Sequence, residues 1–337
     1  MPRKIFLTGA TGFVGSHLVW KLREQGDEVR CLVRRPSKAG WLREIGAKIV
    51  VGDITNRVSM REAMRDCDCV YHLAAMTSGG SSTKRIARLE KTNLVGTRNV
   101  LSLAHNVGVP RIVYASNAAV LGDTQGAWVD EHYTPHDQLS SPYLEAKRRA
   151  HYEVVLPLIA EGAPVIVIMP GLVYGPDATG PIGRLFEKYI QRRLRIIVGG
   201  EALYTWVYVD DLAQGYLQAA SRGCVGESYI LTGPALSIKG LLHQLESLCH
   251  IPAPRFVANG PVKQVTASAL TSLSKIIPFA AGAHAERLRA FSKGTYLVRS
   301  GKAQTELGWS PRPLEEGLQS TLDWYLNRGR QPSLGVP

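Results

Sequence analysis

Tyr143 and Lys147 are the two residues of this chain whose types and spacing best suit proton-transfer chemistry. They follow Ser140, Ser141 and Pro142, an order that predicts a helix start, because hydroxyl side chains cap helices and proline suits an early helical position. Side chains four residues apart share one face of a helix. A tyrosine with its ordinary pKa of about 10 is a poor base, but a neighbouring ammonium stabilises the phenolate. We therefore expect Lys147 to lower the pKa of Tyr143 and to make its hydroxyl a usable proton donor or acceptor.

Taken alone, such a pair is also typical of an exposed aromatic residue beside a solvated lysine, so the elements that position it matter. At the amino terminus, residues 5–7 form an apolar run, three glycines follow, and apolar residues take up helical spacing from Phe13. A strand, a glycine turn and a helix in this order place unpaired N–H groups and a positive dipole end against an anion. We predict that Gly9, Gly12 and Gly15 hold the pyrophosphate of a dinucleotide there.

Strands and helices then alternate along the first half of the chain. Further strands are predicted at 28–33, 47–54, 69–75, 111–116 and 164–169, with helices at 57–66 and 84–106 between them. This alternation is typical of an α/β, Rossmann-type doubly wound parallel sheet with helices on both faces, in which ligands lie at the carboxyl ends of the strands. We expect a dinucleotide-binding domain over 1–169, to which residues 201–225 return, a smaller substrate-binding lobe mainly over 170–330, and a tail over 331–337. Lone His72 is expected to pack within its strand rather than to act as a ligand or base.

Two arginines at the end of the second predicted strand bear on the choice of cofactor. In this fold an acidic residue at that point hydrogen-bonds the adenosine ribose, whereas arginine accommodates a 2′-phosphate. Here Arg34 and Arg35 follow the strand, and no carboxylate does. This favours NADP over NAD, because a guanidinium matches a phosphate with two parallel hydrogen bonds. A solvated basic loop is the alternative.

Composition limits the other classes of function. The chain has 337 residues and a net charge of +12 from scattered basic residues, which without a recognised motif does not favour nucleic-acid binding. Its five cysteines are odd in number and lack metal-site spacing, so we expect buried thiols, a cytoplasmic location and no metal site. We expect no signal peptide, because strand residues begin almost at Met1, and no membrane span, because no segment is long and apolar enough. A small-molecule substrate is expected, and a homodimer is compatible with the sequence.

Seven short motifs occur in order along nearly the whole chain. They are TGATGFVG at 8–15, HLAA at 72–75, NLVGT at 93–97, YLEAK at 143–147, PGLVYGP at 170–176, VYVDDLA at 207–213 and AQTELGWSP at 303–311. Together they resemble the extended short-chain dehydrogenase/reductase superfamily, and within it the NAD-dependent epimerase/dehydratase and dihydroflavonol-reductase-like branches. The resemblance implies a Rossmann-type fold and NAD(P)-dependent chemistry.

The resemblance also implies roles for individual residues. The pyrophosphate would be held by the amino-terminal turn, at Gly9, Thr11, Gly12, Phe13, Val14 and Gly15. The adenosine end would meet Arg34, Asp53 and Ile54. The nicotinamide side would be formed by Leu73, Ala74, Ala75, Pro170 and Val173, with Asn93 supporting it. Tyr143 would be the acid/base, and Lys147 would both lower its pKa and hold the nicotinamide ribose.

Asn117 departs from the family's pattern. The catalytic serine or threonine of the family, counted back from Gly122, corresponds to Asn117 and not to Ser116. Because successive strand residues point to opposite faces, Ser116 cannot take this place without a shift in register or a local bend. An asparagine amide can still donate a hydrogen bond to a substrate oxygen. The candidate catalytic set is therefore Tyr143, Lys147, Asn117 and Ser116, and we expect the Asn117 amide to point toward the Tyr143 hydroxyl.

Three functions remain open from the sequence. The first is an NADP-linked oxidoreductase that reduces a ketone or aldehyde of a medium-sized substrate. The second is a nucleotide-sugar epimerase or dehydratase with internally recycled cofactor, for which Arg184, Lys188 and Arg195 could hold the substrate pyrophosphate. The third, motivated by Asn117, is a cofactor-binding regulatory protein with weakened catalysis. In the smaller lobe, residues 262–291 are expected to pack between helices, with an apolar lid as the alternative.

Overall fold

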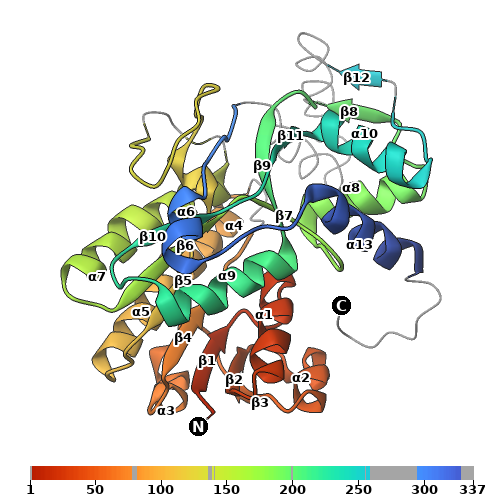
Figure 1. Ribbon diagram of the computed structural model, residues 1–337. Coiled ribbons are helices and arrows are strands. Elements are labelled where there is room, and N and C mark those ends of the chain that lie inside the picture. Colours follow the sequence, from red (N-terminus) through yellow and green to blue (C-terminus); the bar gives the residue numbers. More distant parts are fainter. Residues whose placement is uncertain are drawn as a thin grey trace.

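A seven-stranded parallel sheet forms the centre of the computed structural model, which describes residues 2–77, 82–135, 139, 141–198, 200–254, 256–258 and 294–327 (Figure 1). Its strands are β1 (Lys4–Thr8), β2 (Glu28–Val33), β3 (Lys48–Val51), β4 (Cys69–His72), β5 (Ile112–Ala115), β6 (Val165–Pro170) and β10 (Ser228–Leu231). They lie in the order β10-β6-β5-β4-β1-β2-β3, and every neighbouring pair is parallel. The strand order reverses between β1 and β4, so the predicted Rossmann-type doubly wound fold is confirmed.

Helices cover both faces of this sheet. On one face α1 (Phe13–Glu24) and α9 (Val209–Arg222) pack over Ile5 and Leu7 of β1; we call this the α1 face. On the other face α5 (Gly96–Asn106) and the π-helical η5 (Ala150–Val155) pack over Phe6; we call this the α5 face. Alternate residues of one strand therefore contribute to different hydrophobic clusters, as expected for a strand that is buried on both sides.

Short elements complete the sheet domain. They are η1 (Pro36–Lys38), α2 (Gly40–Glu44), η2 (Arg57–Ser59), α3 (Arg61–Met64), α4 (Thr83–Glu90), the π-helical η3 (Lys91–Val95), η4 (Ala118–Leu121), α6 (Pro142–Arg149) and α7 (Leu156–Ala160). The predicted helix over 57–66 is divided into η2 and α3. The predicted helix over 84–106 is present as α4, η3 and α5 in succession.

A smaller lobe lies at the upper right of Figure 1, beyond the ends of the sheet strands. It contains β7 (Leu172–Tyr174), α8 (Gly180–Ile190), β8 (Ile196–Val198), β9 (Leu203–Tyr208), β11 (Ala235–Ser237), α10 (Ile238–Cys249), β12 (Phe256–Ala258) and α13 (Leu314–Asn327). Its own hydrophobic cluster includes Trp206, which is fully buried and donates from its indole N–H to the Leu236 carbonyl at 3.0 Å.

Parts of the carboxyl-terminal half return to the sheet domain. Strand β10 lies beside β6 as the edge strand of the sheet. Val298 forms a bridge with Val129, and η6 (Ala303–Leu307) and Trp309 join the hydrophobic cluster of the α1 face. The domain bounds expected from the sequence, with the return over 201–225, stay a prediction. Residues 262–291 and the tail over 331–337 lie outside the described residues.

The five cysteines differ in exposure. Cys31, Cys67 and Cys69 are buried, as predicted, but Cys224 is exposed and Cys249 is only partly covered, so the prediction of buried thiols is wrong at Cys224. Cys224 lies in the turn between α9 and β10, and such connections run over the protein surface. Within the described ranges there is no helix long and apolar enough to cross a membrane, and no cluster of three or more His, Cys, Asp or Glu side chains that could hold a metal ion.

Candidate active site

The candidate site lies where the strand order reverses, at the carboxyl ends of β1 and β4. Gly9 follows β1 with φ +86°, and a Cβ atom there would lie 2.7 Å from the Ala74 backbone nitrogen. A Cβ atom on Gly15 would lie 2.0 Å from the Gly9 carbonyl oxygen. Both positions therefore require glycine, because β1, β4 and the start of α1 approach each other too closely for any side chain.

The amino terminus of α1 offers donors to an anion. Its N-cap residue, Gly12, has an extended backbone, no side-chain cap hydrogen bond and no acidic residue in the turn that follows. Thr11 and Gly12 are exposed, so the first N–H groups of the helix are open to a ligand. Such donors at a positive dipole end fit the pyrophosphate of a dinucleotide.

Residues assigned to the adenosine end follow β2 and β3. Arg34 and Arg35 are exposed, and within the described residues neither forms an ion pair. Asp53 Oδ1 accepts hydrogen bonds from the backbone N–H and the hydroxyl of Thr55, both at 2.8 Å. Ile54 is buried against α5, where a Cβ atom on Gly96 would lie 2.5 Å from Ile54 Cδ1. The expected contacts of Arg34, Asp53 and Ile54 with a nucleotide stay predictions.

The loop after β4 carries the residues expected beside the nicotinamide. Leu73, Ala74 and Ala75 are half-buried, and the Ala74 N–H donates to Thr8 Oγ1 at 3.3 Å. Buried Asn93 holds the next part of the loop, since its side chain accepts from the Met76 N–H at 2.7 Å and donates to the Met76 carbonyl at 3.0 Å. On the other side of the site lie buried Pro170, at the end of β6, and half-buried Val173, in β7.

Asn117 and Tyr143 meet at the carboxyl end of β5. Asn117 is the N-cap of η4, and its Oδ1 accepts from the Ala119 N–H at 2.7 Å. Because the carbonyl side of the amide is used there, its NH₂ group is left to donate, and a side-chain hydrogen bond joins Asn117 to Tyr143. Burial raises the pKa of Tyr143, and the hydrogen bond from Asn117 opposes this by stabilising the phenolate. The expected orientation of Asn117 is therefore present.

Lys147 is buried on the same helix but has other partners. Its Nζ donates to Tyr114 Oη at 3.0 Å and to the Ala115 carbonyl at 2.5 Å, and it lies 4.6 Å from the centre of the Tyr114 ring. The pKa of Tyr143 is raised, and Lys147 is not among the groups that shift it, so the expected lowering by Lys147 is not found. The physical reason is that the ammonium turns toward the polar atoms of β5.

Ser116 points away from the candidate catalytic pair. Its hydroxyl lies 3.1 Å from His151 Nδ1, within the α5 face, and its N–H donates to the Ile168 carbonyl at 2.7 Å. Both residues follow β5, where Ser116 contacts His151 and Asn117 contacts Tyr143. Ser116 is buried and does not join the candidate reacting groups.

Sequence reasoning did not single out Thr97, Tyr114 or His151, which line the buried side of the site. A signal for Tyr114 was present, because it occupies a polar position near the end of a predicted strand. His72 is packed as expected, with Nδ1 at 2.7 Å from Thr8 Oγ1 and Nε2 at 3.1 Å from Thr97 Oγ1.

Acid should destabilise the protein through two of its buried histidines, His72 and His151. Burial, with a smaller effect of the Lys147 charge, lowers the pKa of His72 to about 3 and that of His151 to about 4. Below about pH 6.5 the unfolded chain therefore binds protons that the folded protein does not bind. The free energy of unfolding should fall by about 1.4 kcal/mol per pH unit for each histidine. Urea unfolding measured at a series of pH values should show this loss of stability beginning near pH 6.5 and continuing to about pH 4.

A His151→Asn variant should lose stability less steeply, by about one proton, over this pH range. A His132→Asn variant is the control, since His132 is exposed, and should keep the wild-type slope. An unchanged slope in His151→Asn would exclude His151 as a source of the acid sensitivity.

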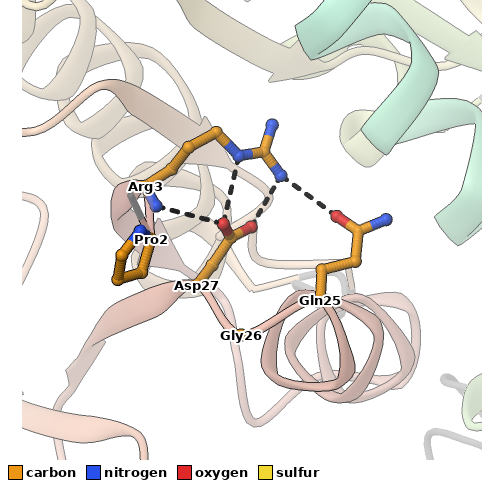
Figure 2. Close-up of a pocket in the computed structure, with 5 residues that line it drawn as sticks. All are labelled: Pro2, Arg3, Gln25, Gly26 and Asp27. Atoms are coloured by element: carbon orange, nitrogen blue, oxygen red, sulfur yellow. Dashed lines mark hydrogen bonds and ion pairs between the residues drawn. The ribbon is translucent and has the colours of Figure 1, made fainter.

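A pocket at the opposite edge of the sheet is not this site. Figure 2 shows that it is lined by Pro2, Arg3, Gln25, Gly26 and Asp27. Arg3 precedes β1 and Asp27 precedes β2, so the pocket lies at the amino ends of the strands. The Arg3 guanidinium pairs with Asp27 at 2.6 Å and donates to Gln25 at 3.1 Å, so its charge is already neutralised. Ligands of doubly wound sheets bind at the other edge.

The three basic residues of the smaller lobe that the sequence suggested do not locate a substrate site. Lys188, on α8, and Arg195, after it, are exposed, whereas Arg184 is half-buried. The role in binding a substrate pyrophosphate that the sequence suggested for these three residues stays a prediction.

Known proteins resemble this chain over nearly its whole length. A family model described as the NAD dependent epimerase/dehydratase family matches residues 5–231. The 4-hydroxy-2-methyl-3-oxo-4-farnesyl-3,4-dihydroquinoline-1-oxide ketoreductase of Stigmatella aurantiaca is 31% identical over 323 residues, which cover 94% of this chain and 95% of that protein. A Synechocystis protein that carries a dihydroflavonol 4-reductase name is 30% identical over 334 residues, covering 96% of this chain and 95% of that protein. The crystal structure of gox2253 matches with a TM-score of 0.82 at 29% identity, covering 98% of this chain and all of that one.

Proposed function

Because this chain belongs to the NAD-dependent epimerase/dehydratase family of extended short-chain dehydrogenase/reductase enzymes, we propose that it reduces a ketone or aldehyde of a medium-sized substrate with NADPH. The observation that carries the proposal is the hydrogen bond between Asn117 and Tyr143 after the carboxyl end of β5. It brings an amide donor and a phenol together at the edge of the sheet where a dinucleotide binds in this fold.

The residues of the chain would then supply the proton chemistry. A bound nicotinamide cofactor supplies the hydride that forms the new C–H bond. The Tyr143 hydroxyl donates its proton to the carbonyl oxygen, so that the carbonyl becomes an alcohol and the tyrosine becomes a phenolate, which regains a proton from solvent. The Asn117 amide stabilises that phenolate and can donate to the substrate oxygen as negative charge develops on it.

The cofactor site that this reaction needs fits the chain's own atoms. The glycine turn leaves no room for side chains at Gly9 and Gly15, and the uncapped start of α1 presents its N–H groups. The pyrophosphate would be held there by Gly9, Thr11, Gly12, Phe13, Val14 and Gly15. The remaining contacts would come from Arg34, Asp53, Ile54, Leu73, Ala74, Ala75, Asn93, Tyr143, Lys147, Pro170 and Val173.

Full-length similarity supports reduction over epimerisation. Two relatives that match nearly the whole chain, at 31% and 30% identity, carry reductase names. A reductase consumes one reduced cofactor for each product molecule, whereas an epimerase or dehydratase returns its cofactor unchanged. A cofactor-binding regulatory protein would turn over neither kind of substrate.

Net cofactor consumption is therefore the decisive measurement. The purified protein should oxidise NADPH in proportion to alcohol formed from at least one compound in a panel of aromatic, alicyclic and prenylated ketones. Conversion of a nucleotide sugar without net oxidation of NADPH would overturn the proposal in favour of an epimerase or dehydratase. Cofactor binding without turnover of either panel would favour the regulatory protein.

A preference for NADP over NAD is a further prediction. Exposed Arg34, with Arg35 beside it, has a guanidinium to offer the 2′-phosphate, and a hydrogen bond to a charged group is worth about 1.5–3 kcal/mol. NADPH should therefore bind roughly ten- to a hundredfold more tightly than NADH at fixed ionic strength, in fluorescence titrations. Arg34→Ala should remove most of this difference.

An Arg193→Ala variant is the matched control, because Arg193 is also exposed but lies after α8. It should keep the NADP preference. Tighter binding of NADH by the wild-type protein would contradict the assignment, and an unchanged preference in Arg34→Ala would move the role to another residue. A homodimer and a cytoplasmic location stay predictions from the sequence, the first of them testable by light scattering.

A further inference from the structure

A row of polar side chains crosses the α5 face of the sheet beneath the candidate site. Thr8, His72 and Tyr114 are direct register neighbours on β1, β4 and β5. Thr8 Oγ1 lies 2.7 Å from His72 Nδ1. All three are buried, so each polar atom needs a partner inside the protein.

Thr97 of α5 contacts two members of this row, His72 and Tyr114. Its hydroxyl lies 3.1 Å from His72 Nε2 and also forms a hydrogen bond with Tyr114. At the far end, Tyr114 Oη accepts from Lys147 Nζ at 3.0 Å. A continuous hydrogen-bonded chain therefore runs from the end of β1, next to the glycine turn, to the ammonium of Lys147.

We propose that Tyr114 is a positioning residue, which holds the Lys147 ammonium against the sheet and keeps it charged for the cofactor contact that the proposed function gives Lys147. The inference rests on the proposed function, in which Tyr143 moves the proton. Thr97 and His72 act through Tyr114, because they fix the direction in which its hydroxyl offers a lone pair.

The chemistry of a buried ammonium explains why this partner matters. A lysine ammonium has three N–H donors, and the structure gives it two acceptors, Tyr114 Oη and the Ala115 carbonyl. Burial alone lowers the pKa of Lys147 to about 7, with no carboxylate of the described residues opposing it. An acceptor on the ammonium therefore decides how much of Lys147 is charged near neutral pH.

Other titratable groups lie around Lys147 and Tyr114, and none of them is substituted in the Tyr114→Phe test. Four such groups interact electrostatically with Lys147 or Tyr114 or lie on the same helix: His72 on β4, Tyr143 on α6, His151 on η5 and Tyr216 on α9. Both histidines stay neutral above about pH 4, since burial lowers the pKa of each to about 4 or below. The titration of Lys147 is therefore separated from theirs by about three pH units.

Tyr114→Phe is the direct test, because it removes only the hydroxyl and keeps the ring beside the ammonium. Losing this acceptor should lower the pKa of Lys147 further, by about one pH unit or more. The alkaline limb of kcat/KM should move to lower pH by the same amount, so that activity falls about tenfold at pH 8 and recovers toward pH 6. Thr97→Val should move it in the same direction by less.

A second readout does not depend on activity. In protein with ¹⁵N-labelled lysine, one Nζ signal should titrate with a midpoint near pH 7, and Lys147→Met should remove it. Its midpoint should fall in Tyr114→Phe. The matched control is Tyr71→Phe, another fully buried tyrosine, which belongs to the α1 face and should leave both readouts as in the wild type.

The outcomes separate the two proposals. Coincident pH profiles and Nζ midpoints in wild type and Tyr114→Phe would overturn the role of Tyr114 even if Tyr143→Phe is inactive. A displaced midpoint with full activity in Tyr143→Phe would instead overturn the proposed role of Tyr143 and leave Tyr114 as the partner that keeps Lys147 charged. If Tyr114→Phe does not fold, Thr97→Val decides in the same way.

Discussion

Tyr143→Phe should lower kcat by about 10²–10⁴-fold while cofactor affinity stays close to that of the wild type. The substitution removes the hydroxyl that Asn117 contacts and retains the buried ring. Proton transfer to the carbonyl oxygen then has no donor, whereas the groups that would hold the cofactor are untouched. Steady-state kinetics with a ketone substrate and fluorescence titration with NADPH measure the two quantities separately.

A phenol elsewhere provides the control. Tyr152 lies on η5, nine residues further along, and Tyr152→Phe also deletes one hydroxyl from a half-buried tyrosine. That variant should keep wild-type kcat. Full activity in Tyr143→Phe would remove Tyr143 from the mechanism, and weaker NADPH binding with unchanged kcat would make it a binding residue only.

Asn117→Asp should abolish most of the activity, although it changes a single group of the side chain. Aspartate can still cap η4 by accepting from the Ala119 N–H, but it cannot donate to the Tyr143 hydroxyl. Loss of a donor aimed at developing negative charge costs about 2.7–4 kcal/mol, or about 10²–10³-fold in kcat. The carboxylate would also raise the pKa of Tyr143, because a like charge disfavours the phenolate.

Two further variants distinguish donation from capping. Asn117→Ser retains both a cap and a hydroxyl donor and should keep or raise kcat, although with a shorter reach. Asn117→Ala should lose kcat and also about 0.5–2 kcal/mol of stability through the missing cap. A wild-type kcat in the aspartate, serine and alanine variants alike would show that Asn117 serves η4 alone and takes no part in the reaction.

Much of the fold follows from local patterns in the sequence. The change from a strand run to helical spacing across Gly9, Gly12 and Gly15 predicts the first βα unit, and β2 begins and ends where the sequence places it. These features depend on residues a few positions apart, which is the range that a periodic pattern encodes. Ser116 and Asn117 contact different groups, His151 and Tyr143, but both follow the end of β5, so strand alternation does not explain their separation.

The direction of Lys147 and the polar row below it depend on the tertiary structure. The i,i+4 spacing puts Lys147 on the same helix face as Tyr143, yet its ammonium contacts Tyr114 and Ala115 of β5. Thr8 and His72 are 64 positions apart, and only the parallel register of β1 and β4 makes them neighbours. The sequence by itself determines the face of the helix or strand on which each side chain lies. The packing of α5 and α6 on the sheet decides which partner the side chain contacts on that face. The partner depends on strand register and helix rotation, which are set by contacts between distant segments.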